Sequence, residues 1–250
     1  MKRRAHKLFS LLILTSAFPL SAQEGTWTLS GSTGIVVLTL KDVEGDNRRD
    51  VELWNLLEKI PIGNFQPLDY AMGYAASGSY RFDRDIALTF SVTNFRKEVA
   101  TSYRGSEASL EMRRTVGTTD FKLGLAYYLP RSFQDIESYF LVELGSMMTR
   151  ATADAFGTRT AKNADSTLTL ITYDSQGVYE KTKLVVTAGF GATSRLFSNV
   201  FMKLEGIYKF AKIGKIDGTL TSFGAPVPHT TSIDFDYSCF FITLGFGMEF

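Results

Sequence analysis

His229, one of the two histidines of the chain, lies close in sequence to residues with which it could perform nucleophilic catalysis. Ser232 and Asp234 follow it, and a serine nucleophile needs its base within hydrogen-bonding distance. His229 falls in a long connection between two predicted strands, where that distance is not fixed, so we expect a solvated loop residue and no enzyme. Cys239 is the only cysteine. No metal-ligand spacing is present, and neither a metal nor a cofactor is expected.

A second set of residues with possible chemistry consists of charged side chains that alternate with apolar ones. They lie on the strand faces that also carry glycine and alanine: Asp120, Lys122, Glu143, Arg195, Lys203, Glu205 and Lys209. Single charges in a narrow interior are costly, so opposite charges there should pair. We expect Glu143 to bridge to Lys122 or Lys203. The set predicts a plug of ion pairs, with a narrow polar conduit or gate as the alternative.

The last predicted strand shows most clearly that such residues lie on β-strands. Every even position from 240 to 250 is large and apolar, and the positions between them are mostly small or polar. This period of two is typical of a strand with one apolar face. The stripe consists of Phe240, Ile242, Leu244, Phe246, Met248 and Phe250.

The start of the chain predicts export. Four basic residues precede an apolar stretch from Leu8 to Leu20, and Ser21 and Ala22 provide a cleavage site, which is typical of a signal peptide over residues 1–22. The apolar stretch is shorter than the ~20 residues that span a bilayer, which disfavours an N-terminal anchor.

Without residues 1–22, 23 basic and 26 acidic residues leave a formal charge of −3. This charge does not favour nucleic acid as a partner, and residues 23–250 are expected to form one domain.

Alternation recurs in eight segments: 27–40, 70–82, 86–96, 115–129, 138–148, 183–196, 200–212 and 233–250. The connections alternate between short ones (83–85, 130–136 and 197–199) and long ones (41–69, 97–114, 149–182 and 213–232). No later run of apolar residues is long enough for a spanning helix. The sequence therefore predicts an all-β, antiparallel, eight-stranded up-and-down transmembrane barrel, with short periplasmic turns and long extracellular loops.

Alternation alone does not decide which face of the strands meets lipid. A secreted barrel of the lipocalin type also alternates, but it turns its apolar residues inward. Here the charged face is the glycine-rich one and aromatic residues lie near the strand ends, so we place the apolar face in lipid; the parity of the first strand stays open.

Residues 50–61 predict a helix in the first long connection, with Val51, Trp54, Leu57 and Ile60 at helical spacing. It would cover the barrel mouth, lie in the outer leaflet or dock another protein.

The closing strand, with its terminal Phe250, resembles that of small eight-stranded bacterial outer-membrane barrels, the group of OmpX-, OmpW- and OmpA-barrel-like proteins. The resemblance implies that the stripe ending at Phe250 is an assembly signal. It also implies outer-membrane lipid, lipopolysaccharide and the assembly machinery as partners, and an extracellular partner reached through the loops. We expect a non-catalytic surface or envelope-structural protein. The alternatives are a narrow channel for small or hydrophobic molecules and, less favoured, a lipid A-modifying enzyme.

Overall fold

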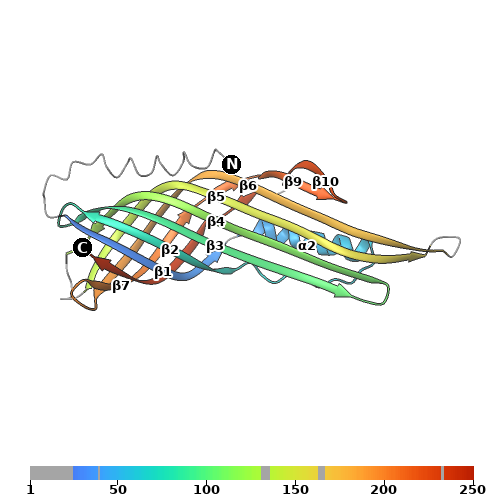
Figure 1. Cartoon of the computed structure of the whole chain (residues 1–250), viewed down its shortest axis with the longest axis horizontal. Coiled ribbons are helices and arrows are strands. Elements are labelled where there is room, and N and C mark those ends of the chain that lie inside the picture. The colour runs from blue at the N-terminus through green and yellow to red at the C-terminus, as the bar shows by residue number, and fades with distance from the viewer. Residues whose placement is uncertain (1–24, 39, 131–135, 163–166, 232–233) are drawn as a thin grey trace.

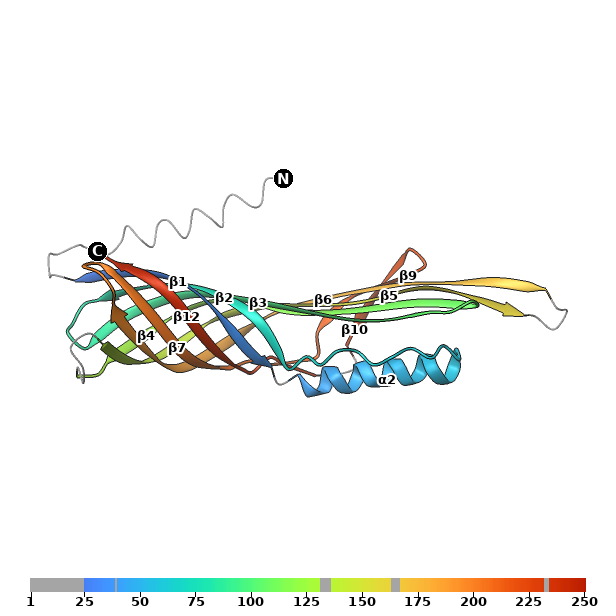
Figure 2. The ribbon, with the colours of Figure 1, turned by 90° about the horizontal axis from the view of Figure 1, so that it is seen from below.

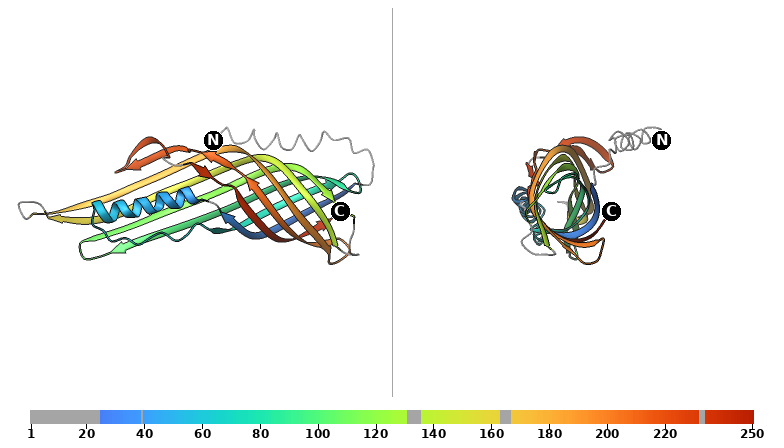
Figure 3. Two further views of the ribbon diagram at one scale, coloured as in Figure 1. Left: turned by 180° about the vertical axis from the view of Figure 1, so that it is seen from behind. Right: turned by 90° about the vertical axis from the view of Figure 1, so that its left-hand side faces the viewer.

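The computed structural model describes residues 25–38, 40–130, 136–162, 167–231 and 234–250. Eight antiparallel strands close into a ring in the order β1-β2-β3-β4-β5-β6-β7-β12, and β12 pairs with β1 (Figure 1 and the end view in Figure 3). The bounds are β1 Thr26–Leu38, β2 Tyr70–Arg81, β3 Ile86–Arg104, β4 Ala108–Tyr128, β5 Ile136–Lys162, β6 Leu168–Arg195, β7 Val200–Phe210 and β12 Cys239–Glu249. The predicted up-and-down barrel is confirmed. The signal peptide expected over residues 1–22 lies outside the described residues.

The barrel closes where the two ends of the described chain meet. The backbone N–H of Phe250 donates to the Trp27 carbonyl at 2.8 Å, and the Trp27 N–H donates to the Phe250 carbonyl at 3.3 Å. The short turns lie at this same end of the barrel, which we call the terminus end (Figure 1).

At the opposite end, β3 to β6 continue far beyond the ring as one curved sheet, which we call the extension (Figure 2). The prediction of long loops over 97–114 and 149–182 is therefore wrong: β5 has 27 residues and β6 has 28. The alternation continues there, but small and polar side chains replace the large apolar ones that marked the strands in the sequence.

The connection between β7 and β12 also contains strands. β9 (Asp217–Ser222) and β10 (Ala225–Thr230) form a hairpin that pairs with β6 through β9, so that β10 is an edge strand. The short strands β8 (Lys212–Gly214) and β11 (Phe235–Asp236) pair with each other. His229, which the sequence placed in a loop, belongs to β10.

Helix α2 (Lys41–Leu57) lies along the extension, on the side continuous with the barrel interior (Figure 2). The helix begins nine residues before the predicted start at Asp50 and ends before Ile60. Val51 and Ile60 are buried against Leu110 and Met112 of β4, with Trp54 packed beside them. The helix thus covers the inward face of the extension, whereas Leu53 and Leu56 are exposed. Among the described residues, no helix has the length and hydropathy needed to cross a membrane.

The two faces of the ring have the predicted polarity. Large apolar side chains point outward on all eight strands, as Leu123, Phe190 and Leu204 do, and the residues between them, most of them polar or small, point inward. The parity left open for β1 is now fixed, since Ile35 and Val37 are exposed and Val36 is buried.

Candidate functional site

The barrel interior contains three buried ion pairs. Lys122 Nζ lies 3.3 Å from Glu143 Oε2, Lys209 Nζ lies 3.1 Å from Asp120 Oδ2, and Lys203 Nζ lies 3.0 Å from Glu205 Oε2. Each of the six residues is less than a tenth exposed. Because a buried charge without a partner is strongly destabilising, the Lys122–Glu143 and Lys209–Asp120 pairs constrain β4 against β5 and β7, whereas Lys203 and Glu205 both belong to β7.

Glycines make room for the Lys122–Glu143 pair. In the ladder between β4 and β5, Lys122 stands opposite Gly145, and Glu143 stands opposite Gly124. A Cβ atom on Gly124 would lie 2.0 Å from the Val142 carbonyl oxygen and 2.6 Å from the Glu143 Cα. The glycines on the inward face are therefore required by the close approach of backbone and charged side chains.

Hydroxyl groups donate further hydrogen bonds to the buried carboxylates. Ser91 and Thr187 donate hydrogen bonds to Glu143 Oε2 at 2.9 and 3.2 Å, and Thr93 donates to Asp120 Oδ2 at 2.8 Å. Tyr139 donates to Glu205 Oε1 at 2.7 Å. These bonds satisfy further lone pairs of the carboxylates, which is what a buried pair needs to be tolerated.

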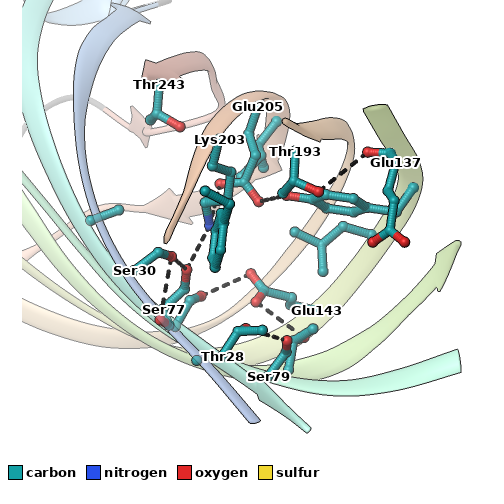
Figure 4. Close-up of a pocket in the computed structure, with 18 of the residues that line it drawn as sticks. Thr28, Ser30, Ser77, Ser79, Glu137, Glu143, Thr193, Lys203, Glu205 and Thr243 are labelled. Carbon is teal, nitrogen blue, oxygen red and sulfur yellow. Dashed lines mark hydrogen bonds and ion pairs between the residues drawn. The ribbon is translucent and has the colours of Figure 1, made fainter. Parts of the chain in front are cut away.

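A polar cavity of about 200 Å³ occupies the terminus end of the barrel, and the Lys122–Glu143 and Lys203–Glu205 pairs are part of its lining (Figure 4). Lys203 and Glu205 point into it from β7, and Lys203 also donates a hydrogen bond to Ser77 at 2.6 Å. The opposite wall is rich in hydroxyl groups, including those of Thr28 and Ser79, which lie 2.7 Å apart. A cavity of this size and polarity has room for on the order of ten water molecules.

Toward the extension, apolar side chains fill the barrel. Ile213, Ile216, Phe235 and Tyr237, from the connection between β7 and β12, pack with buried residues of the wall that include Phe95. Tyr237 is fully buried and its ring stacks on Phe235 with centroids 5.9 Å apart. We call Ile213, Ile216, Phe235 and Tyr237 the apolar plug. It lies at the end of the barrel toward the extension and packs into one buried cluster with the wall.

A smaller polar cluster ties helix α2 to the extension. Arg159 of β5 and Tyr173 of β6 both donate to Glu58 Oε2, at 2.6 and 2.7 Å. The hydrogen bond from Tyr173, together with the hydrogen bond and charge of Arg159, lowers the pKa of Glu58 below its ordinary value of 4.5, although partial burial opposes the shift. Arg114 and Asp50 form a further ion pair between β4 and the helix.

Not every residue predicted for the interior belongs to the buried network. The side chain of Arg195 is 54% exposed at the rim of the cavity, where it lies 2.8 Å from Glu249. Arg195 is therefore a rim residue and not part of the plug of ion pairs. Asp120 and Lys122 share a face, as the sequence predicted, but each pairs with a residue of another strand.

The other candidate residues are placed as follows. The side chains of the apolar stripe point outward, those from Phe240 to Met248 on β12 and that of Phe250 directly after it. Their role in assembly stays a prediction. His229 Nδ1 lies 3.1 Å from the Tyr179 hydroxyl. Among the described residues, no group of three or more His, Cys, Asp or Glu side chains could hold a metal ion.

Sequence reasoning missed the hydroxyl partners and the apolar plug. Ser91, Thr93 and Thr187 share the inward parity of the charged residues, so the alternation could have identified them. Ile213 and Ile216 lie in or beside the very short strand β8, where no period indicates a contact. Phe235 and Tyr237 fall within the segment 233–250 that was predicted as the last strand, but β12 begins only at Cys239, and both side chains pack into the apolar cluster before it.

No family model matches the chain, and no curated protein matches it. Among solved structures, it is similar to Ail, the attachment invasion locus protein of Yersinia pestis (13% identity, 91% of this chain and 100% of that chain, TM-score 0.43). It is also similar to the outer membrane protein OprG from Pseudomonas aeruginosa (12%, 90% and 96%, 0.46) and to a major outer membrane protein from Thermus thermophilus (9%, 91% and 100%, 0.49). The likeness concerns the fold alone.

Proposed function

We propose that this protein is an outer-membrane barrel whose lumen is closed and whose extension presents a rigid, non-catalytic interaction surface outside the cell. The membrane placement is supported by the outward apolar side chains around the whole ring, because an exposed apolar surface of this extent needs a cover. The terminus end would face the periplasm, since barrels of this class have short periplasmic turns and longer extracellular segments.

The observation that carries the surface role is the packing of α2 on the extension. Long extracellular segments are commonly loops, but here four strands, a helix and the ties at Glu58 and Asp50 hold one shape. A preorganised surface binds a partner with little loss of conformational entropy. The apolar plug supports a closed lumen, because it fills the barrel between the cavity and the extension.

A narrow channel is the second candidate, and the polar cavity favours it. Conduction would require the apolar plug to move. Conductance of the refolded protein across a planar bilayer distinguishes the two functions. We expect no steady current from the wild-type protein, and a current after Tyr237→Ala, which removes the largest side chain of the plug. Steady conduction by the wild type would overturn the closed-lumen proposal.

A further inference from the structure

The outward surface of β3, β4 and β5 changes from apolar to charged within a few residues. In the ladders, Val92 stands opposite Phe121, and four residues further along β3, Arg96 stands opposite Gly117. Gly117 also stands opposite Arg150 of β5. Arg96, Gly117 and Arg150 therefore lie side by side in a row across the three strands, just beyond the apolar surface.

The position of this row follows from strand geometry. Four residues of a strand cover roughly 13 Å, and the tilt of barrel strands reduces the rise along the membrane normal to roughly 10 Å. Polar headgroup layers extend roughly 5–8 Å beyond each side of the hydrocarbon core. Long arginine side chains can reach back toward this layer while their stems stay on the strand.

Both arginines have N–H donors that no close ion pair occupies. Arg96 lies 3.6 Å from Glu98, and Arg150 lies 3.5 Å from Glu180, with the two arginine side chains 71% and 65% exposed. Charge-assisted hydrogen bonds are shorter, about 2.7–2.9 Å. By contrast, Arg113, which also points outward but lies four residues further out on β4, is 2.5 Å from Glu111.

On the membrane placement proposed above, we infer that Arg96 and Arg150 form a binding site for a phosphate group of an outer-leaflet lipid. The guanidinium fork matches the geometry of phosphate oxygens, and Gly117 puts no side chain between the two arginines. The apolar surface directly below accommodates the acyl chains of the same lipid. Glu98 and Glu180 are the competing partners, and their loose contacts leave both arginines able to turn toward a stronger acceptor.

The test uses the folded protein in detergent and native mass spectrometry. The probes are lipid A with its phosphates and the same lipid after enzymatic removal of the phosphates. We expect wild-type protein to retain the phosphorylated lipid preferentially. Arg96→Gln and Arg150→Gln should each weaken this binding about tenfold, as expected for the loss of one charge-assisted contact. The matched control Arg113→Gln, on the same face but beyond the headgroup layer, should retain lipid as the wild type does.

The outcomes separate this site from the membrane placement itself. If wild-type protein does not insert into vesicles, the proposed function fails and the lipid site fails with it. If the protein inserts but the double variant Arg96→Gln/Arg150→Gln keeps the preference, only the site is wrong. An equal loss in Arg113→Gln would show general charge attraction instead of a site. Displacement of the lipid by free inorganic phosphate would identify a site for a soluble anion and overturn the lipid assignment.

Discussion

Strands β3 to β6 run through both the barrel and the extension, with opposite polarity in the two regions. In the barrel, β4 turns Leu123 outward and Lys122 inward; in the extension, it turns Arg113 outward and Met112 inward. The ring surrounds a narrow polar interior and offers its outer face to lipid, whereas the extension packs a helix inside and offers its outer face to water. One strand can therefore serve two surroundings, because alternation fixes only which residues share a face and not which face is apolar.

Breaking a buried ion pair of the barrel should have the largest effect. Glu143→Gln removes the charge that faces Lys122 and leaves a buried lysine without its counterion, which costs about 3–5 kcal/mol. We expect a lower midpoint of unfolding in urea. Glu249→Gln removes the partner of Arg195 at the exposed rim and serves as the control, with a loss below about 1 kcal/mol. Equal midpoints for both variants would contradict a structural role for the buried pair.

A single arginine substitution in either half of β4 tests whether the outer face of the strand passes from lipid to water. Leu123→Arg puts a charge on the lipid face and should cost about 2–4 kcal/mol near the bilayer midplane. Thr115→Arg places the same residue on the same side of the strand in the extension, where water surrounds it, and should have little effect. Folding equilibria in lipid vesicles measure both. A smaller loss for Leu123→Arg than for Thr115→Arg would reverse the assignment of membrane and solvent.

The smallest effect concerns the contact between α2 and the extension. Because the pKa of Glu58 is lowered in the folded protein, its contribution to stability is present above the ordinary value of 4.5 and is lost as the pH falls through the lowered value. Trp54 packs edge-on against Tyr173, with ring centroids 4.8 Å apart, so its fluorescence should report this loss in a Trp27→Phe background.

We expect the fluorescence change to occur below pH 4.5 and to be absent from Glu58→Gln. The barrel, followed by its β-sheet circular dichroism, should stay folded across the same range. A transition centred above pH 4.5 in the wild type would show that another group controls the contact.

The sequence was sufficient for the ring but not for the extension. Large apolar residues at every second position, as in 240–250, are what lipid demands of a strand, so these segments were recognisable. The same alternation in 150–162 pairs alanines with threonines and charged residues, and such a pattern does not differ from that of a solvated loop. The start of α2 was missed because residues 41–49 are mostly polar, and their one apolar residue, Val43, is buried in a cluster with residues distant in sequence.

The buried pairs show a similar limit. Parity placed Lys122, Lys203 and Glu143 inside the barrel but left open which of the two lysines pairs with Glu143. Which lysine meets Asp120 depends on the stagger between β4 and β7, which are not neighbours in the ring, and no local pattern encodes that stagger.

The edge strand β10 has a consequence for association between molecules. An open sheet normally ends in a row of free N–H and C=O groups that can recruit a strand of another molecule, and the extension, unlike the closed ring, has such an end. Pro226 and Pro228 stand in β10, and proline has no N–H to offer. Pairing of a strand from another molecule with this edge is therefore disfavoured.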